Sequence, residues 1–420
     1  MRAMKLALPS FQFRFMPSMG NIIFPGNFHP VGTQRAAELM VDRASEGATA
    51  EPGAGGTWLI VGSSGGFGSA ARIAVGVGRG AHTLGVSFDA QPNAESNNKI
   101  RKIGSPGWHR NVAIERRLRT RGLTARSLNG DAFDPETIAG VVSEIRENFD
   151  GKIDGVVWAL AAPKVTNPRT GKAVSSALKP VGKAATIKTL RGPDAKAGTG
   201  PMVSTLELQP GSPEEAISTI FVMGGGIVTQ WHDALAEADV LAEGCTFLTV
   251  SYRGNATNAP VYRNGLIGLA KADLEYQTKV VDAALAKRGG RALAVEGPAV
   301  VTEASGGIPG VSLYLATVLD VMGDKFEDPL ASMMRLFRDH LGPDGPTVDD
   351  HGLLRMDDIE LGEDIQAEIA TRYAAVEDGS PFPEASFDTF MRAYGQTRGF
   401  DVEGVDYEAE FDTDEVCAVP

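Results

Sequence analysis

Short strand-like runs, most of them apolar, recur along this chain, and segments with helical periodicity separate most of them. The runs occupy residues 57–62, 82–88, 124–128, 155–160, 246–251 and 292–296. Alternation of this kind predicts an α/β fold, a doubly wound parallel sheet with helices on both faces. Ligands of such sheets bind beyond the carboxyl ends of the strands, so the residues after each run are the first candidates for a site.

The first run leads into a turn of small residues before a helical pattern begins. Gly62, Gly66 and Gly68 have a G-x-x-x-G-x-G spacing, which allows backbone amides to approach a pyrophosphate at a helix N-terminus. The residues between these glycines are Ser63, Ser64, Gly65 and Phe67. A glycine turn is a weak signal alone, because this chain holds 50 glycines.

The second run strengthens that interpretation, because it ends at Phe88 and Asp89, about twenty residues beyond the turn. A carboxylate at this place accepts hydrogen bonds from the hydroxyls of an adenosine ribose and repels a 2′-phosphate. Together with the turn, Asp89 predicts a Rossmann-like site that prefers NADH to NADPH. The alternative is an aspartate that only forms a turn after its strand.

The stretch after the fifth run has residues suited to reductase chemistry. Tyr252 lies just upstream of Tyr262, and Lys271 follows Tyr262 by nine positions. A phenol near an ammonium group can protonate a substrate oxygen that gains charge as hydride arrives, and the cation is expected to lower the phenol pKa. Positions nine apart on one helix point in nearly opposite directions. Tyr262 and Lys271 can therefore converge only if the helix starts late, and the flanking proline and glycine favour a start at residues 263–265.

The other strand ends bring further candidates to the same edge of the sheet. They are Asp131 and Ala132 after the third run, Leu160 and Ala161 after the fourth, and Val300, Val301 and Thr302 after the last. The gap between the fourth and fifth runs exceeds an ordinary crossover, and we expect it to hold two helices, 213–222 and 229–242, that cover the substrate. Beyond residue 302 the apolar faces of the helical patterns indicate core.

These patterns divide the chain into five parts around one sheet. We expect an N-terminal segment at 1–52, the first part of a dinucleotide-binding domain at 53–162, a substrate-binding insertion at 163–243, the second part of the core at 244–305 and a helical region at 306–420. The predicted fold is thus Rossmann-like with an enlarged helical substrate-binding subdomain.

Composition and charge describe a soluble globular protein of more than one subdomain. The chain has 420 residues, 43% of them apolar, and its formal charge of −13 argues against binding to nucleic acid. Within residues 163–200 the balance reverses, with only Asp194 opposing the basic residues Lys164, Arg169, Lys172, Lys179, Lys183, Lys188, Arg191 and Lys196. This basic stretch is either a surface for an anionic ligand or a solvated loop.

The cysteines and histidines exclude several classes of site. Cys245 and Cys417 offer no disulfide framework, which fits a reducing cytoplasm, and the six histidines have no metal-ligand spacing, so we predict no metal. Basic residues near the N-terminus precede no long hydrophobic region, so we expect an extension or misassigned start rather than a signal peptide. No apolar stretch reaches the roughly 18 residues of a membrane span, so no membrane insertion is expected.

Several motifs, spread over almost the whole chain, resemble those of the trans-2-enoyl-CoA and enoyl-acyl-carrier-protein reductases of the FabV type, relatives of the short-chain dehydrogenases. They are HPVG at 29–32, PGW at 106–108, NGDAF at 129–133, SALKP at 176–180, VMGG at 222–225, VVTEAS at 300–305 and GVDY at 404–407. The Tyr-x8-Lys spacing is the specific element, because ordinary short-chain dehydrogenases have three residues between the tyrosine and the lysine and smaller enoyl reductases have six.

The resemblance implies a role for each candidate. It makes Tyr262 the proton donor, Tyr252 the contact of the thioester carbonyl and Lys271 the residue that holds the nicotinamide ribose. It also implies a pyrophosphate turn at 62–68, an adenosine end at Phe88 and Asp89, and a monomeric protein. Adenine is expected at Asp131 and Ala132, and nicotinamide at Leu160, Ala161, Val300, Val301 and Thr302.

Departures from the family pattern lie around the substrate. Ala259 stands where relatives carry an aromatic residue, and GNATN at 254–258 replaces a more apolar run. Gly297 and Pro298 replace a lysine and a serine, and Asp89 replaces a glutamate. We therefore expect Ala259 to contact the substrate at a wider or more polar pocket mouth, with an altered acyl group.

The leading hypothesis is NADH-dependent reduction of the C2=C3 bond of a trans-2-enoyl thioester, carried on coenzyme A or an acyl-carrier protein. One alternative is a reductase of ketones or of an unusual conjugated acyl group in a specialised pathway. Another is a non-catalytic NADH-binding protein.

Overall fold

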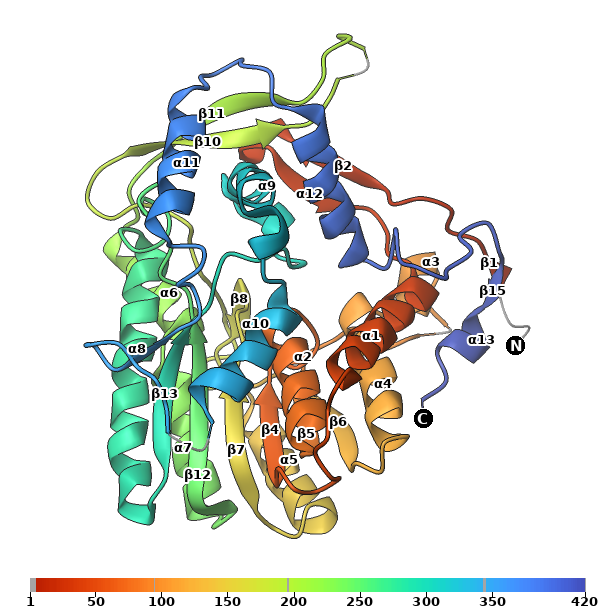
Figure 1. Cartoon of the computed structure of the whole chain (residues 1–420), viewed down its shortest axis with the longest axis vertical. Coiled ribbons are helices and arrows are strands. Elements are labelled where there is room, and N and C mark those ends of the chain that lie inside the picture. Colours follow the sequence, from red (N-terminus) through yellow and green to blue (C-terminus); the bar gives the residue numbers. More distant parts are fainter. Residues whose placement is uncertain (1–4, 94, 195, 343–344, 420) are drawn as a thin grey trace.

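A seven-stranded parallel sheet forms the centre of the computed structural model, which describes residues 5–93, 95–194, 196–342 and 345–419 (Figure 1). The strand order is β14-β13-β12-β7-β4-β5-β6, and every neighbouring pair is parallel. The strands are β4 (Thr57–Val61), β5 (His82–Ser87), β6 (Ala125–Asn129), β7 (Ile153–Trp158), β12 (Leu241–Ser251), β13 (Arg291–Glu296) and β14 (Leu353–Arg355). The predicted doubly wound α/β fold is confirmed.

Two strands differ from the prediction. The edge strand β14 was not predicted, since its three residues are too few to show a pattern. Strand β12 begins at Leu241, ahead of the expected run, and its pairing with β7 shifts register between Leu241 and Thr246. The polar residues at this irregularity hide the first part of the strand from a search for apolar runs.

Helices cover both faces of the sheet, because its central strands are buried on both sides. In β4, Leu59 and Val61 pack on one face, and Trp58 and Ile60 pack on the other. The first face carries α5 (Pro135–Asn148), α7 (Gly226–Glu237) and α8 (Leu266–Leu285). The second carries α1 (Pro30–Ser45), α2 (Gly66–Ile73), α4 (Pro106–Arg119) and α10 (Pro329–Arg335).

A second layer of elements gathers above one end of the sheet, in the upper half of Figure 1. It contains β2 (Phe13–Met16), β3 (Ile22–Pro25), β10 (Ala185–Arg191), β11 (Met202–Leu208), α9 (Val311–Met322), α11 (Glu363–Ala374) and α12 (Glu384–Gln396). Ile23, Leu190, Leu313 and Phe390 share its apolar core. Segments from both ends of the chain therefore enclose α9.

The insertion between β7 and β12 is less helical than predicted. The basic stretch forms one antiparallel hairpin, β8 (Lys164–Thr166) with β9 (Ala173–Ser175), and contributes β10 to a second hairpin with β11. Helix α6 (Pro213–Met223) agrees with the predicted 213–222, whereas α7 begins and ends before the predicted 229–242. Buried Trp231 fixes α7 to the sheet, so this helix is core rather than a cover for the substrate.

Short elements complete the chain. They are β1 (Lys5–Leu6), which pairs with β15 (Phe411–Asp412), and the helices α3 (Lys99–Lys102) and α13 (Thr413–Val416). Cys245 is buried in β12, and both cysteines are free thiols. Among the helices described, none is long and apolar enough to cross a membrane.

Candidate active site

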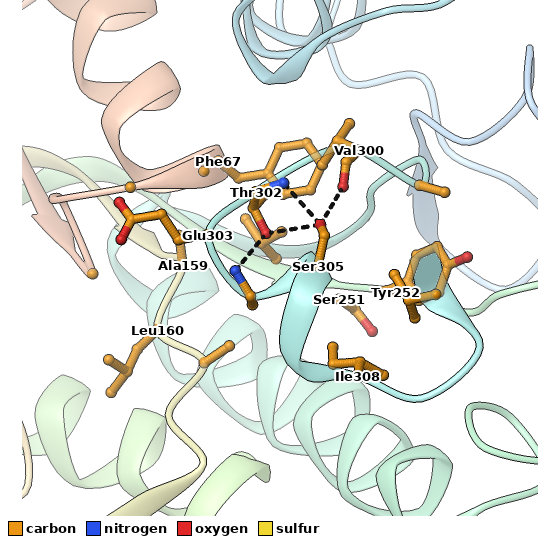
Figure 2. Close-up of a pocket in the computed structure, with 18 of the residues that line it drawn as sticks. Phe67, Ala159, Leu160, Ser251, Tyr252, Val300, Thr302, Glu303, Ser305 and Ile308 are labelled. Carbon is orange, nitrogen blue, oxygen red and sulfur yellow. Dashed lines mark hydrogen bonds between the residues drawn. The ribbon is translucent and has the colours of Figure 1, made fainter. Parts of the chain in front are cut away.

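One cavity of about 440 Å³ lies where the carboxyl ends of β4, β7, β12 and β13 meet the second layer. Figure 2 shows Leu160 and Ala159 at one end of it and Tyr252 and Ile308 at the other. Tyr262, Lys271 and the glycine turn line the same space. The structure thus brings the predicted reductase residues and the predicted nucleotide turn together.

The glycine turn fits closely because two of its positions exclude a side chain. Gly62 has a φ of +89°, and a Cβ there would lie 2.8 Å from the backbone nitrogen of Leu160. A Cβ on Gly68 would lie 2.0 Å from the carbonyl oxygen of Gly62. Gly65 is the N-cap of α2, so the helix presents its first backbone amides to the cavity.

Two residues of the turn serve its packing. Gly68 does not line the cavity but lets α2 approach β4, and Ser63 is buried with its hydroxyl on the Asn111 amide oxygen at 3.2 Å. Ser64, Gly66 and Phe67 line the cavity wall. The predicted cofactor turn therefore divides into residues that face the cavity and residues that hold the turn.

Asp89 lies at the cavity edge with one carboxylate oxygen held and the other unpaired. Its Oδ1 accepts a hydrogen bond from the Ser105 hydroxyl at 3.0 Å, and its backbone exchanges two hydrogen bonds with the Asn129 side chain. Its Oδ2 is buried and has no partner among the described residues. An unpaired carboxylate oxygen beside a glycine-rich turn fits the ribose hydroxyls of NADH. Asp89 and the glycine turn would therefore hold NADH.

The expected adenine contacts do not reach this cavity. Ala132 is buried in the core, where its carbonyl accepts a hydrogen bond from Trp231, and the Asp131 carboxylate caps its own turn through the amide of Phe133. Phe88, by contrast, is 76% exposed, and a second hollow opens beside Asp89 and Trp108. Neither Asp131 nor Ala132 lines that hollow.

Tyr262 lies outside the helix that carries Lys271. Helix α8 begins at Leu266 with Gly265 as its N-cap, and Tyr262 belongs to the preceding turn. The predicted late helix start is thus confirmed to within one residue. The rings of Tyr252 and Tyr262 meet edge to face with their centroids 4.8 Å apart, so the two phenols form one wall.

The electrostatics of the phenols differ from the expectation that Lys271 lowers the Tyr262 pKa. Burial, followed by the negative charge of Glu360, raises the pKa of Tyr262, and the same causes raise that of Tyr252. Burial also lowers the pKa of Lys271, while Glu296 and Glu275 oppose that shift. Without ligand both tyrosines are firmly protonated, which suits hydrogen-bond donors.

Two buried carboxyl groups lie near Lys271. Glu275 follows Lys271 by one turn of α8 and accepts hydrogen bonds from Arg263 at 2.8 and 3.3 Å. Glu296, at the end of β13, is fully buried, and burial and neighbouring Glu275 raise its pKa to about 7. Because the arginine holds Glu275 ionised, the proton of the pair resides on Glu296.

The expected nicotinamide side of the cavity is a loop fixed by its own hydrogen bonds. The Ser305 hydroxyl accepts from the amide of Thr302 at 2.8 Å and donates to the carbonyl of Val300 at 3.3 Å, as the dashed lines in Figure 2 show. Val300 and Thr302 line the cavity with Leu160 and Ala161. Val301 packs away from it into the core around α9.

Ala259 does not line the cavity, contrary to expectation. Its carbonyl accepts the amide of Asn264 at 2.8 Å, so it shapes the turn that carries Tyr262. Asn258 donates a hydrogen bond to the Tyr252 hydroxyl and Asn255 donates to that of Tyr314, but neither asparagine lines the cavity. Both lie in the GNATN segment.

Sequence reasoning missed further residues at the site. Tyr314 and Leu315 of α9 line the cavity, although their helix was interpreted as core, and buried Glu360 approaches from beyond β14. A tyrosine on an otherwise apolar helix was the available signal for Tyr314. Nothing in the sequence around Glu360 marked it. Across the described ranges, no cluster of three or more potential ligands could hold a metal ion.

Family models match most of the chain. Residues 102–341 match the trans-2-enoyl-CoA reductase catalytic region, and residues 16–94 match the NAD(P)H binding domain of trans-2-enoyl-CoA reductase. Residues 348–411, which include β14, α11 and α12, match a model described as an enoyl reductase FAD binding domain.

Known proteins resemble the chain over nearly its whole length. An enoyl-[acyl-carrier-protein] reductase [NADH] of Pseudomonas fluorescens is 37% identical over 92% of this chain and 94% of its own. The trans-2-enoyl-CoA reductase of Clostridium acetobutulicum in complex with NADH superposes with a TM-score of 0.85 at 31% identity, covering 97% of this chain and 99% of that one. The Treponema denticola trans-2-enoyl-CoA reductase in complex with NAD superposes with a TM-score of 0.83 at 33% identity, covering 96% of this chain and 98% of that one. The chain therefore belongs to the trans-2-enoyl-CoA reductase family.

Proposed function

We propose that this protein uses NADH to reduce the C2=C3 bond of a trans-2-enoyl thioester. The observation that carries the proposal is the single cavity that joins Tyr252, Tyr262 and Lys271 to the glycine turn. Relatives named as NADH-dependent enoyl reductases support it, as does their similarity over the whole chain.

The two phenols would act on the thioester carbonyl. NADH, when bound, supplies the hydride that adds to C3, and negative charge then builds on the thioester oxygen. Tyr262 and Tyr252 donate hydrogen bonds to that oxygen, because both keep their protons at neutral pH. The two tyrosine rings already pack against each other in the protein, so their hydroxyl groups need little reorganisation when the thioester binds. The enolate then takes a proton from solvent at C2 and collapses to the saturated thioester.

Lys271 would bind and orient the ribose next to the nicotinamide. Its ammonium is buried and donates only a long hydrogen bond of 3.4 Å to the carbonyl of Val250, so donor capacity remains for a ligand hydroxyl. The nearby ionised Glu275 favours its charged form. Asp89 would hold the other ribose.

Product analysis separates this reaction from its main alternative. With NADH and crotonyl-CoA, we expect a thioester heavier by two hydrogens, measured by mass spectrometry as NADH absorbance falls. Acetoacetyl-CoA should be reduced at least tenfold more slowly, a discrimination that the oriented phenols would provide. Preferential conversion of the ketone to an alcohol would contradict the proposal, as would binding of NADH without turnover of any enoyl thioester.

We further propose that the β8–β9 hairpin meets the phosphates of the substrate carrier. It begins three residues after Ala161 of the cavity, and Lys164, Arg169 and Lys172 on it are exposed and join no ion pair within the described residues. Other members of the basic stretch are engaged, since Lys179 pairs with Glu215 and Lys188 donates to the carbonyls of Tyr373 and Val376. Lys183 and Lys196 are exposed as well, but Lys164, Arg169 and Lys172 follow in sequence on Ala161, which lines the cavity. We expect the protein to act as a cytoplasmic monomer.

A further inference from the structure

Behind Tyr252 lies a chain of buried polar groups that the reaction as proposed does not use. The Nδ2 of Asn258 donates to the Tyr252 hydroxyl at 2.8 Å. The opposite atom of the amide, Oδ1, accepts the backbone N–H of Asn255 at 2.9 Å, and this contact fixes which end of the amide faces the tyrosine. Gly254 makes room for the arrangement, since a Cβ there would lie 2.3 Å from that Oδ1.

The direction of this hydrogen bond determines what the phenol can do. An amide NH₂ group only donates, so the Tyr252 oxygen is the acceptor and its own hydrogen remains available. Tyr252 lines the cavity, where the substrate carbonyl would lie. Asn258 therefore leaves Tyr252 as a hydrogen-bond donor toward the substrate.

The orientation of Asn255 is fixed in the same way. Its Oδ1 accepts the backbone amides of Thr257 at 2.9 Å and Asn258 at 3.3 Å. Its Nδ2 consequently faces the Tyr314 hydroxyl and the Oε1 of Glu360, the latter at 3.4 Å. The loop that holds Asn258 is thus tied to α9 and to the segment after β14.

Glu360 joins this chain to the nicotinamide side. It is 1% exposed, its Oε1 accepts from Tyr314, and its Oε2 accepts the backbone amide of Ala299 at 2.6 Å. Ala299 directly precedes Val300 of the nicotinamide loop. One buried carboxylate therefore anchors the loop beside the cofactor and the amides that orient Tyr252.

We propose that Asn258, held by Asn255 and Glu360, is a positioning residue that aims the hydroxyl hydrogen of Tyr252 at the thioester oxygen. The inference rests on the proposed function and deepens it. It assigns the polar GNATN segment to the orientation of a catalytic phenol, rather than to recognition of a polar acyl group.

The isosteric change Asn258→Asp tests the direction of the bond. A carboxylate still accepts from Asn255 but now also accepts from Tyr252, so it diverts the phenol hydrogen from the substrate. We expect kcat with crotonyl-CoA to fall about 10- to 100-fold, while the Kd for NADH changes less than about twofold. Asn258→Leu removes the donor without adding charge and should also lower kcat. Asn264→Asp, on the exposed part of the same turn, is the matched control and should behave as wild type.

A double-mutant cycle separates positioning from a general structural effect. In a Tyr252→Phe background the phenol hydrogen is gone, so Asn258→Asp should cost less than about a further twofold. Losses that multiply in the double variant would overturn the inference, as would Asn258→Asp and Asn258→Leu enzymes with wild-type kcat. If the wild-type protein does not reduce enoyl thioesters, the proposed function is refuted instead. The double-mutant cycle therefore tests the role of Asn258 in a wild-type protein that reduces crotonyl-CoA.

Discussion

At the residue scale, burial sets the properties of the site more than direct charge pairing does. The sequence correctly placed Tyr252, Tyr262 and Lys271 at one strand edge, but it predicted a lowered phenol pKa from a cation. In the folded protein burial and Glu360 raise the pKa of both tyrosines. Glu360 lies about a hundred residues from Tyr262 in the chain, and only tertiary packing reveals its influence.

Asp89 offers the clearest residue-scale prediction for the cofactor. Its unpaired Oδ2 would accept from a ribose hydroxyl and repel a 2′-phosphate. Asp89→Asn removes the charge yet keeps a polar partner for Ser105, so the ratio of kcat/KM for NADPH to that for NADH should rise about tenfold. Glu95→Gln, an equal charge change on an exposed residue nearby, should leave the ratio unchanged. An unaltered ratio in Asp89→Asn would remove Asp89 from cofactor selection.

At the element scale, the long apolar strands were predictable and the short or basic ones were not. Six of the seven sheet strands follow predicted runs, and the five strands between the two edges are mostly apolar because both faces of the sheet are buried. The three-residue β14 and the short β8–β9 hairpin contain too few apolar positions to identify, and β10 and β11 mix apolar with polar residues. Their strands are defined by antiparallel pairing or packing that the local sequence does not encode.

The end of β13 carries an element-scale prediction about stability and pH. Glu296 has a pKa of about 7 in the folded protein against an ordinary 4.5. The stability that its protonation contributes is therefore fully present below pH 4.5 and is lost as the pH rises through about 7. The unfolding free energy of wild type relative to Glu296→Gln should therefore fall by about 1–3 kcal/mol between pH 5 and 8, measured by urea denaturation. Glu243→Gln, an exposed change on β12, is the control. A difference that stays constant with pH would contradict the assignment of the proton to Glu296.

At the scale of the whole molecule, an acidic protein presents a local basic arm. The chain carries a formal charge of −13, yet the β8–β9 hairpin beside the cavity is cationic. Lys164→Glu with Lys172→Glu should raise the KM for an acyl-CoA about tenfold at low salt, and the difference should shrink at high salt because ions screen exposed charges. The control is Lys279→Glu with Lys287→Glu, which makes the same charge change at exposed positions in α8 and just after it. Equal effects of the two pairs would indicate a general charge effect rather than a binding arm.

The most direct test of the central claim is the activity of Tyr262→Phe with NADH and crotonyl-CoA. The hydroxyl of Tyr262 makes no hydrogen bond within the described residues and lies in the cavity wall, so its removal should disturb little but the chemistry. We expect kcat to fall at least about 1000-fold while NADH binds with unchanged Kd, as measured by cofactor fluorescence. Turnover close to that of wild type, with cofactor binding intact, would contradict the role assigned to Tyr262 and with it the proposed reaction.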